Sequence, residues 1–481
     1  MQLRLLIPVC LLLSFTTPPL QTQIRRLNPP VPQTFQTRIT RSWVTTRVTP
    51  TQTFQTPQTR ITRSWVTTRV TPTQTLQTLQ TPQTLQTLQT PQTDNRRLNP
   101  PVQHHPDWGF FAHKRINRLA TMTLPPEMMV FFKPNIDYLT DHAVDPDMRR
   151  YASKHEAPRH YIDLDNYGQP PFDQLPRQWL DALLAHTEIW IVDASGDTSL
   201  LIGPKKPLQE VWRRDYKQWF NRQVAARFYQ DDETISADSL NTFLDFMGRK
   251  EKPVAAFYRE HLSEHGVLPW NLQRMQRQLT DAFRQRDGKR ILKLAADMGH
   301  YIGDAHVPLH TTSNYNGQKT GQHGIHGFWE SRIPELFADD SYDYFVGKPE
   351  YIERTEDWFW QSVFDSNKLV DSVLNFEKAL RRSFPQDRQM CPDMRLGTMV
   401  VVPCRDFAAA YQESLNGMIE RRLRAAIHAV SSAWYTAWVD AGEPDLSVIG
   451  KPALSEEDRK EAEELRKTFD QGRILGRAED H

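Results

Sequence analysis

The sequence predicts an all-α fold, in which a compact multi-helix bundle follows a disordered, low-complexity N-terminal segment. Two observations lead to this prediction. The composition changes abruptly at Trp108, from a tract rich in Thr, Gln and Pro to an aromatic-rich chain. From that point the apolar residues repeat at the three- and four-residue steps of amphipathic helices. We divide the chain into a signal peptide at 1–20, the disordered segment at 21–107, a helical domain at 108–440 and a C-terminal helical extension at 441–481.

The first residues resemble a secretion signal. Arg4 gives a positively charged start, and residues 5–15 form an apolar stretch of suitable length. The stretch is too short for a membrane-spanning helix, which needs roughly 20 apolar residues. We therefore expect no transmembrane segment and a secreted, periplasmic or cell-surface location. An apolar N-terminus without a targeting role is the alternative.

Residues 21–107 are built from repeats. A 17-residue sequence occurs at 37–53 and again at 59–75, and the heptapeptide at 25–31 returns at 96–102. Such a tract has too few apolar side chains to offset the entropy lost on ordering, so we expect it to be disordered. It is either a stalk at the cell surface, a tandem duplication without a role, or the result of a misassigned start codon.

The amphipathic helices follow one another through the rest of the chain. In 291–304, for example, Ile291, Ala295 and Ile302 lie on one apolar stripe. The expected helices are 177–186, 208–229, 272–286, 291–304, 355–376, 406–440 and 455–473, and the two strand-like runs are 189–193 and 399–402.

The distribution of charge argues against a broad nucleic-acid-binding surface. The chain has 59 Lys and Arg against 58 Asp and Glu. Residues 1–107 contain eleven Arg, no Lys and two acids, which leaves 48 basic and 56 acidic residues in 108–481. The globular part is therefore mildly acidic, whereas affinity for a polyanion rests on Lys and Arg.

The chain has three cysteines. Cys10 lies in the signal peptide, and Cys391 and Cys404 lie thirteen residues apart in a loop-like stretch. The latter two either form a disulfide in an oxidising compartment or stay as two free thiols.

The strongest candidate site is His300-Tyr-Ile-Gly-Asp304-Ala-His306-Val-Pro-Leu-His310. His300 and Asp304 are four residues apart on an expected helix, so both side chains project from one face. An imidazole and a carboxylate placed in this way can bind one metal ion, and the second carboxylate oxygen can bridge to another. Pro308 ends the helix and turns His310 back toward the site.

Further clusters supply the same residue types. His326 and Glu330 repeat the four-residue spacing, Asp145 precedes His160 by fifteen residues, and His113 lies at the start of the domain. One such pair often arises by chance on a solvated helix, and His160 alone reads as a core histidine. Together the clusters indicate a metal site. Histidine and carboxylate ligands without thiolates suit catalytic zinc or manganese.

These motifs resemble those of the superfamily that joins bacterial zinc-dependent phospholipase C with the single-strand-specific nucleases of the S-one/P-one type. The resemblance covers the motifs over 108–335, and its most specific element is the HxxxDxxxxxH pattern. It implies a compact helical bundle that holds up to three zinc ions in a cleft. The implied ligands are Asp145, His160, His300 and Asp304 for one ion; Asp304, His113 and the α-amine and carbonyl of Trp108 for the second; and His310, His326 and Glu330 for the third.

Two parts of the sequence do not match the family pattern directly: the residues that precede Trp108, and the residues that follow Asp145. The amine-ligating tryptophan of the family is the first residue of the mature protein, whereas 107 residues precede Trp108. Cleavage after Asp107, a misplaced gene start or an incomplete metal site would each explain this difference. Asp147, Arg149 and Arg150 follow the first carboxylate where the nucleases keep a phosphate-facing arginine, and we assign neither arginine a role.

The residues around the motifs are expected to support them. His306 and His323 are spare histidines, for which positions behind the ligands or facing solvent are expected. Asp163 is a candidate to orient the imidazole of His160, because ligand histidines usually donate their second N–H to an acid. A solvated acid is the alternative for Asp163.

The motifs and the resemblance predict a zinc-dependent phosphoesterase of the phospholipase C type, which hydrolyses phosphodiester bonds with a metal-activated water. Asp145 and Asp304 are the candidate catalytic residues, because either carboxylate can orient this water. The expected substrate is a phospholipid or a single-stranded nucleic acid, without a stable nucleic-acid complex. Two alternatives stay open: a nuclease that releases 5′-nucleotides, and a non-catalytic surface protein stabilised by metal.

Overall fold

The structure is a computed structural model, and it describes residues 110–395, 398–450, 452, 455–472, 474–475 and 477. The expected signal peptide, the repeat segment and Trp108 lie outside the described residues. The described part is mostly helical, as predicted, and it also contains two small sheets, which the expected all-α class did not include. None of the described helices has both the length and the apolar composition needed to cross a bilayer.

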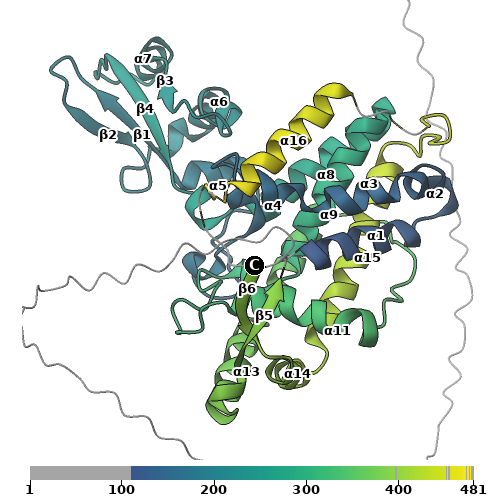
Figure 1. Cartoon of the computed structure of the whole chain (residues 1–481). Helices are drawn as coiled ribbons and strands as arrows, with labels where there is room; N and C mark the ends of the chain where they lie inside the picture. Colours follow the sequence, from purple (N-terminus) through teal and green to yellow (C-terminus); the bar gives the residue numbers. More distant parts are fainter. Residues whose placement is uncertain are drawn as a thin grey trace, which may run out of the picture. The chain divides into compact units, whose positions relative to one another are not determined.

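Four helices form the centre of the domain and lie against one another (Figure 1). They are α1 (Phe110–Thr123), α8 (Leu268–Gln285), α9 (Gly288–Ala305) and α15 (Met418–Asp440). The apolar stripe predicted on α9 is buried, since Ile291, Ala295 and Ile302 are at most 1% exposed. Trp434 of α15 donates its indole N–H to the carbonyl of Ala295 at 3.2 Å. The helix that carries the strongest motif is therefore part of the core.

Two glycines on α9 allow α1 to approach it closely. A Cβ atom at Gly299 would collide with the side chain of Asn117, and one at Gly303 would lie 2.9 Å from Nδ1 of His113. Asn117 uses this space to donate a hydrogen bond to the carbonyl of Ala296 at 3.0 Å. The close contact between α1 and α9 places His113 beside the motif residues of α9.

Further helices complete the fold, and two of the expected long helices are divided. The segment 355–376 forms α12 and α13, and 406–440 forms α14 and α15. The second break occurs where Asn416 and Gly417 take left-handed backbone angles, with φ of 47° and 70°. These further helices are α2 (Pro126–Phe132), α3 (Ile136–Asp141), α4 (Asp145–Arg149), α5 (Trp179–Ala185), α6 (Arg213–Gln223), α7 (Ala237–Phe246), α10 (Ile325–Gly327), α11 (Ile333–Ser341), α12 (Thr355–Asn367), α13 (Val370–Ser383), α14 (Arg405–Ser414) and α16 (Glu456–Asp470).

A four-stranded antiparallel sheet was not predicted. Its order is β2-β1-β4-β3, and α7 packs against β4. On β1 the residues Ile189 and Ile191 face Tyr258 and Ala256 of β4, and these four side chains are buried. Since β4 mixes small, aromatic and charged residues, its strand character depends on pairing with β1. The strands are β1 (Thr187–Val192), β2 (Thr198–Ile202), β3 (Thr234–Ile235) and β4 (Ala255–Glu260).

A hairpin of β5 (Met390–Arg395) and β6 (Thr398–Pro403) contains the second predicted strand. Cys391 on β5 and Cys404 after β6 form a disulfide, with their Cα atoms 5.0 Å apart. The first of the two alternatives for these cysteines is therefore the one observed.

The C-terminal extension packs against the domain through α16. Phe469 is 8% exposed, and its ring lies 5.8 Å from that of Phe110 and 4.8 Å from that of Tyr151. After α16 the chain stays close to the domain, since the amide of Leu475 donates to the carbonyl of Arg150 at 2.9 Å. The last described residues thus lie beside the segment that follows α4.

Candidate metal centre

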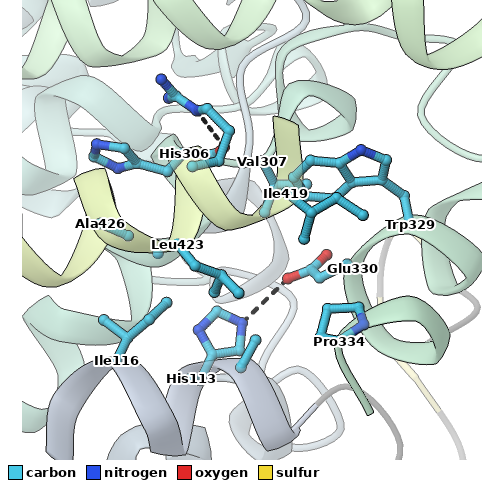
Figure 2. A pocket seen from close by; sticks show the side chains of 13 residues that line it. His113, Ile116, His306, Val307, Trp329, Glu330, Pro334, Ile419, Leu423 and Ala426 are labelled. Carbon is cyan, nitrogen blue, oxygen red and sulfur yellow. Dashed lines mark hydrogen bonds and ion pairs between the residues drawn. The ribbon is translucent and has the colours of Figure 1, made fainter. Parts of the chain in front are cut away.

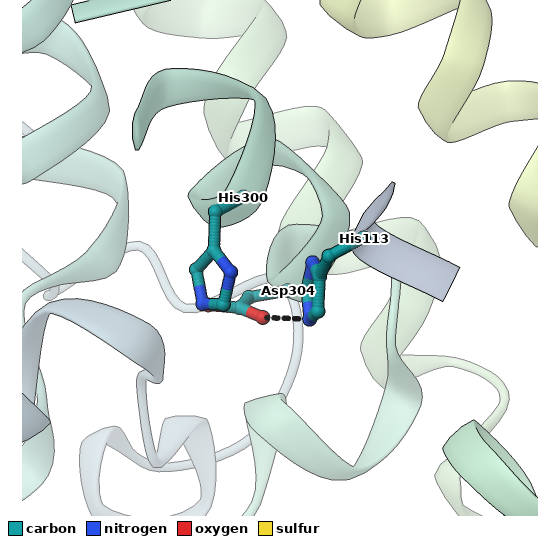
Figure 3. A group of neighbouring side chains, drawn as sticks. All are labelled: His113, His300 and Asp304. Atoms are coloured by element: carbon teal, nitrogen blue, oxygen red, sulfur yellow. Dashed lines mark ion pairs between the residues drawn. The ribbon is translucent and has the colours of Figure 1, made fainter. Parts of the chain in front are cut away.

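Among the residues that the structure describes, eight buried residues form three neighbouring groups of metal-ligand type, two of which share His300. In each group, one ligand atom of every member lies within 4.8 Å of the others. Counted over the whole residue, none of the eight is more than 5% exposed. We call these eight residues the metal centre, and parts of it are drawn in Figure 2 and Figure 3. The groups are His113, His300 and Asp304; Asp147, His160 and His300; and His310, His326 and Glu330.

Helix α9 provides the middle of the metal centre. His300 and Asp304 lie one turn apart, with Nε2 of the imidazole 3.4 Å from Oδ2 of the carboxylate. Nδ1 of His300 is 2.8 Å from the carbonyl of Ala143. This carbonyl can only accept a hydrogen bond, so Nδ1 carries the proton and Nε2 is left for a metal ion.

His113 of α1 reaches the same carboxylate from the other side. Figure 3 shows its ring next to that of His300, and the ring centroids are 3.9 Å apart. Nε2 of His113 lies 3.5 Å from Oδ1 of Asp304 and 3.3 Å from Oε1 of Glu330. The second of these contacts is drawn in Figure 2. His113 therefore connects carboxylates of two different groups.

His160 approaches α9 from the short 3-10 turn Ala157–His160. Its Nδ1 lies 3.1 Å from Oδ2 of Asp304 and 3.1 Å from Nε2 of His300. Oδ1 of Asp147 is 3.6 Å from Nδ1 of His160 and 3.6 Å from Nε2 of His300. Two imidazole nitrogens and two carboxylates thus surround one point.

The aspartate in this group is Asp147, and Asp145 lies outside it, which corrects the assignment of Asp145 as a ligand and catalytic residue. Asp145 begins α4, and its Oδ2 lies 2.7 Å from Nδ1 of His142. Because successive helical residues are rotated by about 100°, Asp147 points to nearly the opposite side of α4. The side chain of Asp145 is 20% exposed and that of Asp147 is 7% exposed.

The third group comes from two neighbouring segments after α9. His310 lies in the turn Pro308–Thr311, and its Nε2 is 3.4 Å from Oε2 of Glu330. Nε2 of His326 lies 2.8 Å from the same oxygen. Glu330 belongs to a π-helical stretch, Phe328–Arg332, between α10 and α11. Such wider turns occur frequently at functional sites, where they redirect a side chain.

Burial controls the protonation of the central histidines. The pKa values of His160 and His300 lie well below the usual value, because burial and a neighbouring histidine disfavour the charged ring. Both rings are therefore neutral at neutral pH, which is the metal-binding form. At His113 burial also acts to lower the pKa, but the hydrogen bond to Glu330 and the charge of Asp304 raise it to about 9. A bound cation would take the place of that proton.

The acids show why a cation fits between these side chains. Burial raises the pKa of Asp304 well above its usual range, against the opposing effect of His310. At Glu330 burial has the same tendency, but hydrogen bonds from His113 and His310 outweigh it and hold the pKa well below the usual value. Within the described residues, Oδ2 of Asp304 and Nε2 of His160 have no hydrogen-bond partner. Since a buried polar atom without a hydrogen bond is costly, and these atoms are of metal-ligand type, the residues present fit a divalent cation.

Glu156 is a buried acid behind His160 that was not predicted. Its Oε1 lies 3.8 Å from Nε2 of His160, and Tyr301 donates its hydroxyl to the same oxygen. Asp163, the acid expected in this place, instead pairs with Arg477 at 2.7 Å. Glu156 precedes His160 by four residues, so the same-face spacing was the signal that would have identified it.

A small cavity adjoins the metal centre on the side of α15 (Figure 2). Its volume is about 20 Å³, which is room for about one water molecule. His306 lines this cavity, with Nδ1 2.8 Å from the carbonyl of Ile302. Burial and the charge of Arg422 lower its pKa to about 3, so it is a neutral structural histidine. His323 is exposed.

The outcome for the predicted ligands differs between residues. Asp145 lies outside the metal centre, and Trp108 lies outside the described residues. The comparison with models of protein families and with curated protein sequences gave no match for this chain. The predicted ligands that the structure brings together are His113, His160, His300, Asp304, His310, His326 and Glu330.

Proposed function

We propose that this chain is a zinc-dependent phosphoesterase of the phospholipase C type, which hydrolyses phosphodiester bonds outside the cytoplasm. One observation carries the proposal. Histidine and carboxylate side chains from α1, α4, α9 and the segments around them meet in one buried set of three metal-ligand groups. Such a concentration of buried ionisable groups with shifted pKa values is typical of a functional site.

Zinc is the metal that suits these donors best. Catalytic zinc takes imidazole nitrogens and carboxylate oxygens, often with three protein ligands and one open position. Each of the three groups supplies three such ligands. Calcium and magnesium prefer oxygen ligands, so the histidine content argues against them. We therefore propose up to three zinc ions, with the α-amine of Trp108 as a further ligand if the chain is cleaved before it.

The residues of the metal centre have distinct tasks in this proposal. Bound zinc would act as a Lewis acid toward the phosphate and lower the pKa of a water toward about 7. Asp304, which contacts histidines of all three groups, would orient the attacking water, and Asp147 would support it from the second group. In this step the water oxygen would bond to phosphorus, the P–O bond to the leaving alcohol would break, and the proton lost by the water would pass to the alcohol oxygen.

Two features support the proposed location. The disulfide between Cys391 and Cys404 is the kind of bond that persists in an oxidising compartment. The apolar residues at the N-terminus resemble a secretion signal.

The test is a zinc analysis combined with a substrate panel. The purified full chain should contain zinc and should hydrolyse bis-p-nitrophenyl phosphate and phosphatidylcholine. A chelator should remove this activity, and added zinc should restore it. Cleavage of single-stranded DNA or RNA to 5′-nucleotides without lipid hydrolysis would instead make the chain a nuclease. Retained zinc without hydrolysis of any of these esters would favour the non-catalytic alternative.

Asp304→Asn gives the matching test on the protein. Because one carboxylate serves more than one group, this change should abolish phosphodiester hydrolysis and lower the zinc content by at least one ion per chain. Asn keeps the shape of the side chain, so the fold should persist by circular dichroism. Full turnover in this variant would remove the metal-centre proposal.

A further inference from the structure

The β5–β6 hairpin, labelled in Figure 1, has two faces of opposite character. Side chains of a strand point alternately to its two sides, so directly paired residues share a face. One face packs against the domain, where Val402 is 2% exposed and Asp393 pairs with Arg332 at 3.1 Å. We call the residues of the other face the apolar face. They are Met390 paired with Pro403, Pro392 with Val401, and Met394 with Met399.

The apolar face is open to solvent. Met390, Met394 and Met399 are 47%, 61% and 60% exposed, and Val401 is 68% exposed. These are four of the thirteen large apolar residues that are exposed in the described part of the chain, so the exposure is concentrated on one hairpin. Single apolar residues on a surface need no explanation, whereas a contiguous patch marks a site of interaction. The apolar face is therefore a candidate docking surface.

The base of the hairpin is fixed to itself and to the domain. The disulfide between Cys391 and Cys404 joins the two strands there. Gln389, the residue before β5, donates a hydrogen bond from Nε2 to the carbonyl of Arg381 in the last turn of α13, at 2.8 Å. A surface that is already ordered loses little conformational entropy when it binds. The apolar face is thus prepared for a partner.

Arg332 connects the hairpin to the metal centre. It follows Glu330 by two residues in the π-helical stretch Phe328–Arg332 and is 8% exposed. Its Nε donates to the carbonyl of Pro403 on β6 at 3.3 Å, and its Nη1 donates to Asp393 on β5. Both strands are therefore held by the segment that carries a candidate zinc ligand. A partner bound at the apolar face would be held close to this segment.

The size and chemistry of the apolar face argue against a second protein chain as the partner. The four exposed residues present on the order of 400 Å², whereas a stable interface buries about 800 Å² on each protein. Protein interfaces also carry about one hydrogen bond per 100–200 Å². Met, Val and Pro side chains donate none, and the thioether is only a weak acceptor. The acyl region of a lipid surface needs no hydrogen bonds and fits this face better.

The residues that flank the hairpin indicate the kind of lipid surface. Arg388 lies two residues before β5, and Arg405 lies two residues after β6. Each has an acid as its neighbour in the sequence, Asp387 or Asp406, and Arg388 also pairs with Asp406. Two positive and two negative charges sum to zero at these flanks. Anionic membranes attract clusters of Lys and Arg, so a neutral surround fits a zwitterionic surface instead.

We propose that the apolar face docks this protein onto a zwitterionic lipid surface, with Met394, Met399 and Val401 entering the boundary between headgroups and acyl chains. Peripheral segments of this kind reach about 5–10 Å into that boundary without spanning the bilayer. Unbranched Met side chains adapt to irregular apolar surroundings, which suits contact with mobile chains. This docking goes beyond the phosphoesterase function proposed above and requires no catalysis. Its consequence for that function is that phospholipid would be held near the metal centre.

Binding to phosphatidylcholine vesicles tests the proposal. The full chain is mixed with vesicles of pure dioleoyl phosphatidylcholine, and the bound fraction is measured by flotation at about 0.1 M and about 1 M sodium chloride. The wild type should bind at both concentrations. Salt screens the attraction between charges but leaves the burial of apolar side chains in place, so the bound fraction should not fall at the higher concentration.

Two Met-to-Gln changes on the apolar face should remove this binding. Each Met exposes on the order of 100 Å², so Met394→Gln combined with Met399→Gln should lower the vesicle partition coefficient on the order of tenfold or more. Met122→Gln is the matched control, since Met122 lies on α1 and is 50% exposed, and it should bind like the wild type. If the double variant does not fold, Val401→Thr decides, because it keeps the side-chain shape and must then lower the partition coefficient several-fold.

Hydrolysis separates the docking from the phosphoesterase. The double variant should hydrolyse soluble bis-p-nitrophenyl phosphate as fast as the wild type, whereas its hydrolysis of vesicular phosphatidylcholine should fall together with binding. Vesicle binding that depends on the apolar face, without hydrolysis of any ester, would support the docking and reject the phosphoesterase.

Three results would overturn the docking while the phosphoesterase stands. One is equal vesicle binding in the wild type and in the double variant. Another is a wild type that hydrolyses the soluble ester but does not bind the vesicles; if it is a dimer that the double variant makes monomeric, the apolar face belongs to a second copy of this chain. The third is binding that requires phosphatidylserine in the vesicles and is abolished by salt, which would assign it to charged residues.

Discussion

Asp147→Asn and Asp145→Asn form a matched pair that tests which carboxylate belongs to the metal centre. In both variants a neutral amide replaces a carboxylate of the same shape. Oδ1 of Asp147 lies 3.6 Å from imidazole nitrogens of both His160 and His300, so its loss removes one of three donors in a group. Mutation of an acid that only hydrogen-bonds to a metal ligand lowers metal affinity by about 10–100-fold, or about 1.4–2.7 kcal/mol. If Asp147 is itself a ligand, Asp147→Asn should lower zinc affinity by more than this.

The expected effect of Asp145→Asn is much smaller. Asp145 contacts His142 at 2.7 Å in a partly exposed pair, and such pairs contribute about 0.2–1 kcal/mol to stability. Zinc content and activity should therefore stay at the wild-type level, with a small loss of thermal stability. Zinc per chain and kcat/KM for bis-p-nitrophenyl phosphate measure both variants. Loss of zinc and activity in Asp145→Asn, together with full activity in Asp147→Asn, would refute the corrected assignment.

Three further predictions concern the surroundings of the metal centre. Burial acts to lower the pKa of His142, but the hydrogen bond and charge of Asp145 outweigh burial, and the pKa is raised. The pair therefore stabilises the fold fully below a pH of about 6.5, the ordinary pKa of histidine. This stabilisation is lost as the pH rises through the higher pKa of the folded state. The melting temperature of the wild type should thus exceed that of Asp145→Asn more at pH 6 than at pH 9, and an equal difference at both would contradict this. Gly303→Ala places a Cβ atom 2.9 Å from Nδ1 of His113, and such overpacking costs about 1–3 kcal/mol. Alanine regains about 1 kcal/mol through its higher helix propensity. Urea unfolding should therefore show a loss of stability of up to about 2 kcal/mol, and the zinc content should fall. Glu156→Gln should lower zinc affinity about 10–100-fold in a chelator competition and shift the pH–rate profile, and an unchanged affinity would make Glu156 a packing residue only.

The ligand spacings were predictable because they are local. Residues four apart on a helix share a face whatever the rest of the fold does, which made His300 with Asp304 and His326 with Glu330 recognisable from the sequence. The buried stripe of α9 follows from the same geometry. For such pairs the sequence contains all the information that is needed.

The choice between Asp145 and Asp147 was not local. Both acids lie in the first turn of α4, and only the packing of that helix decides which of them faces inward. The strand β4 was missed for a related reason, since its pairing with β1 crosses more than sixty residues of sequence. The contact of Arg477 with Asp163 spans 314 residues, and no periodicity links them. Tertiary packing, and not propensity, determines each of these features.

The contacts among the three groups have a consequence for the proposed binding of metal. His300 belongs to two groups, and Oδ1 of Asp304 lies 3.5 Å from His113 of the first group and 3.8 Å from His310 of the third. In the proposed metal centre His300 and Asp304 would therefore couple the occupancy of neighbouring sites, because a cation at one site would change the charge felt at the next. The side chains with most of these contacts sit on α9, in the middle of the core, where packing allows little displacement. The central helix α9 thus holds candidate ligands from distant parts of the chain in one fixed arrangement.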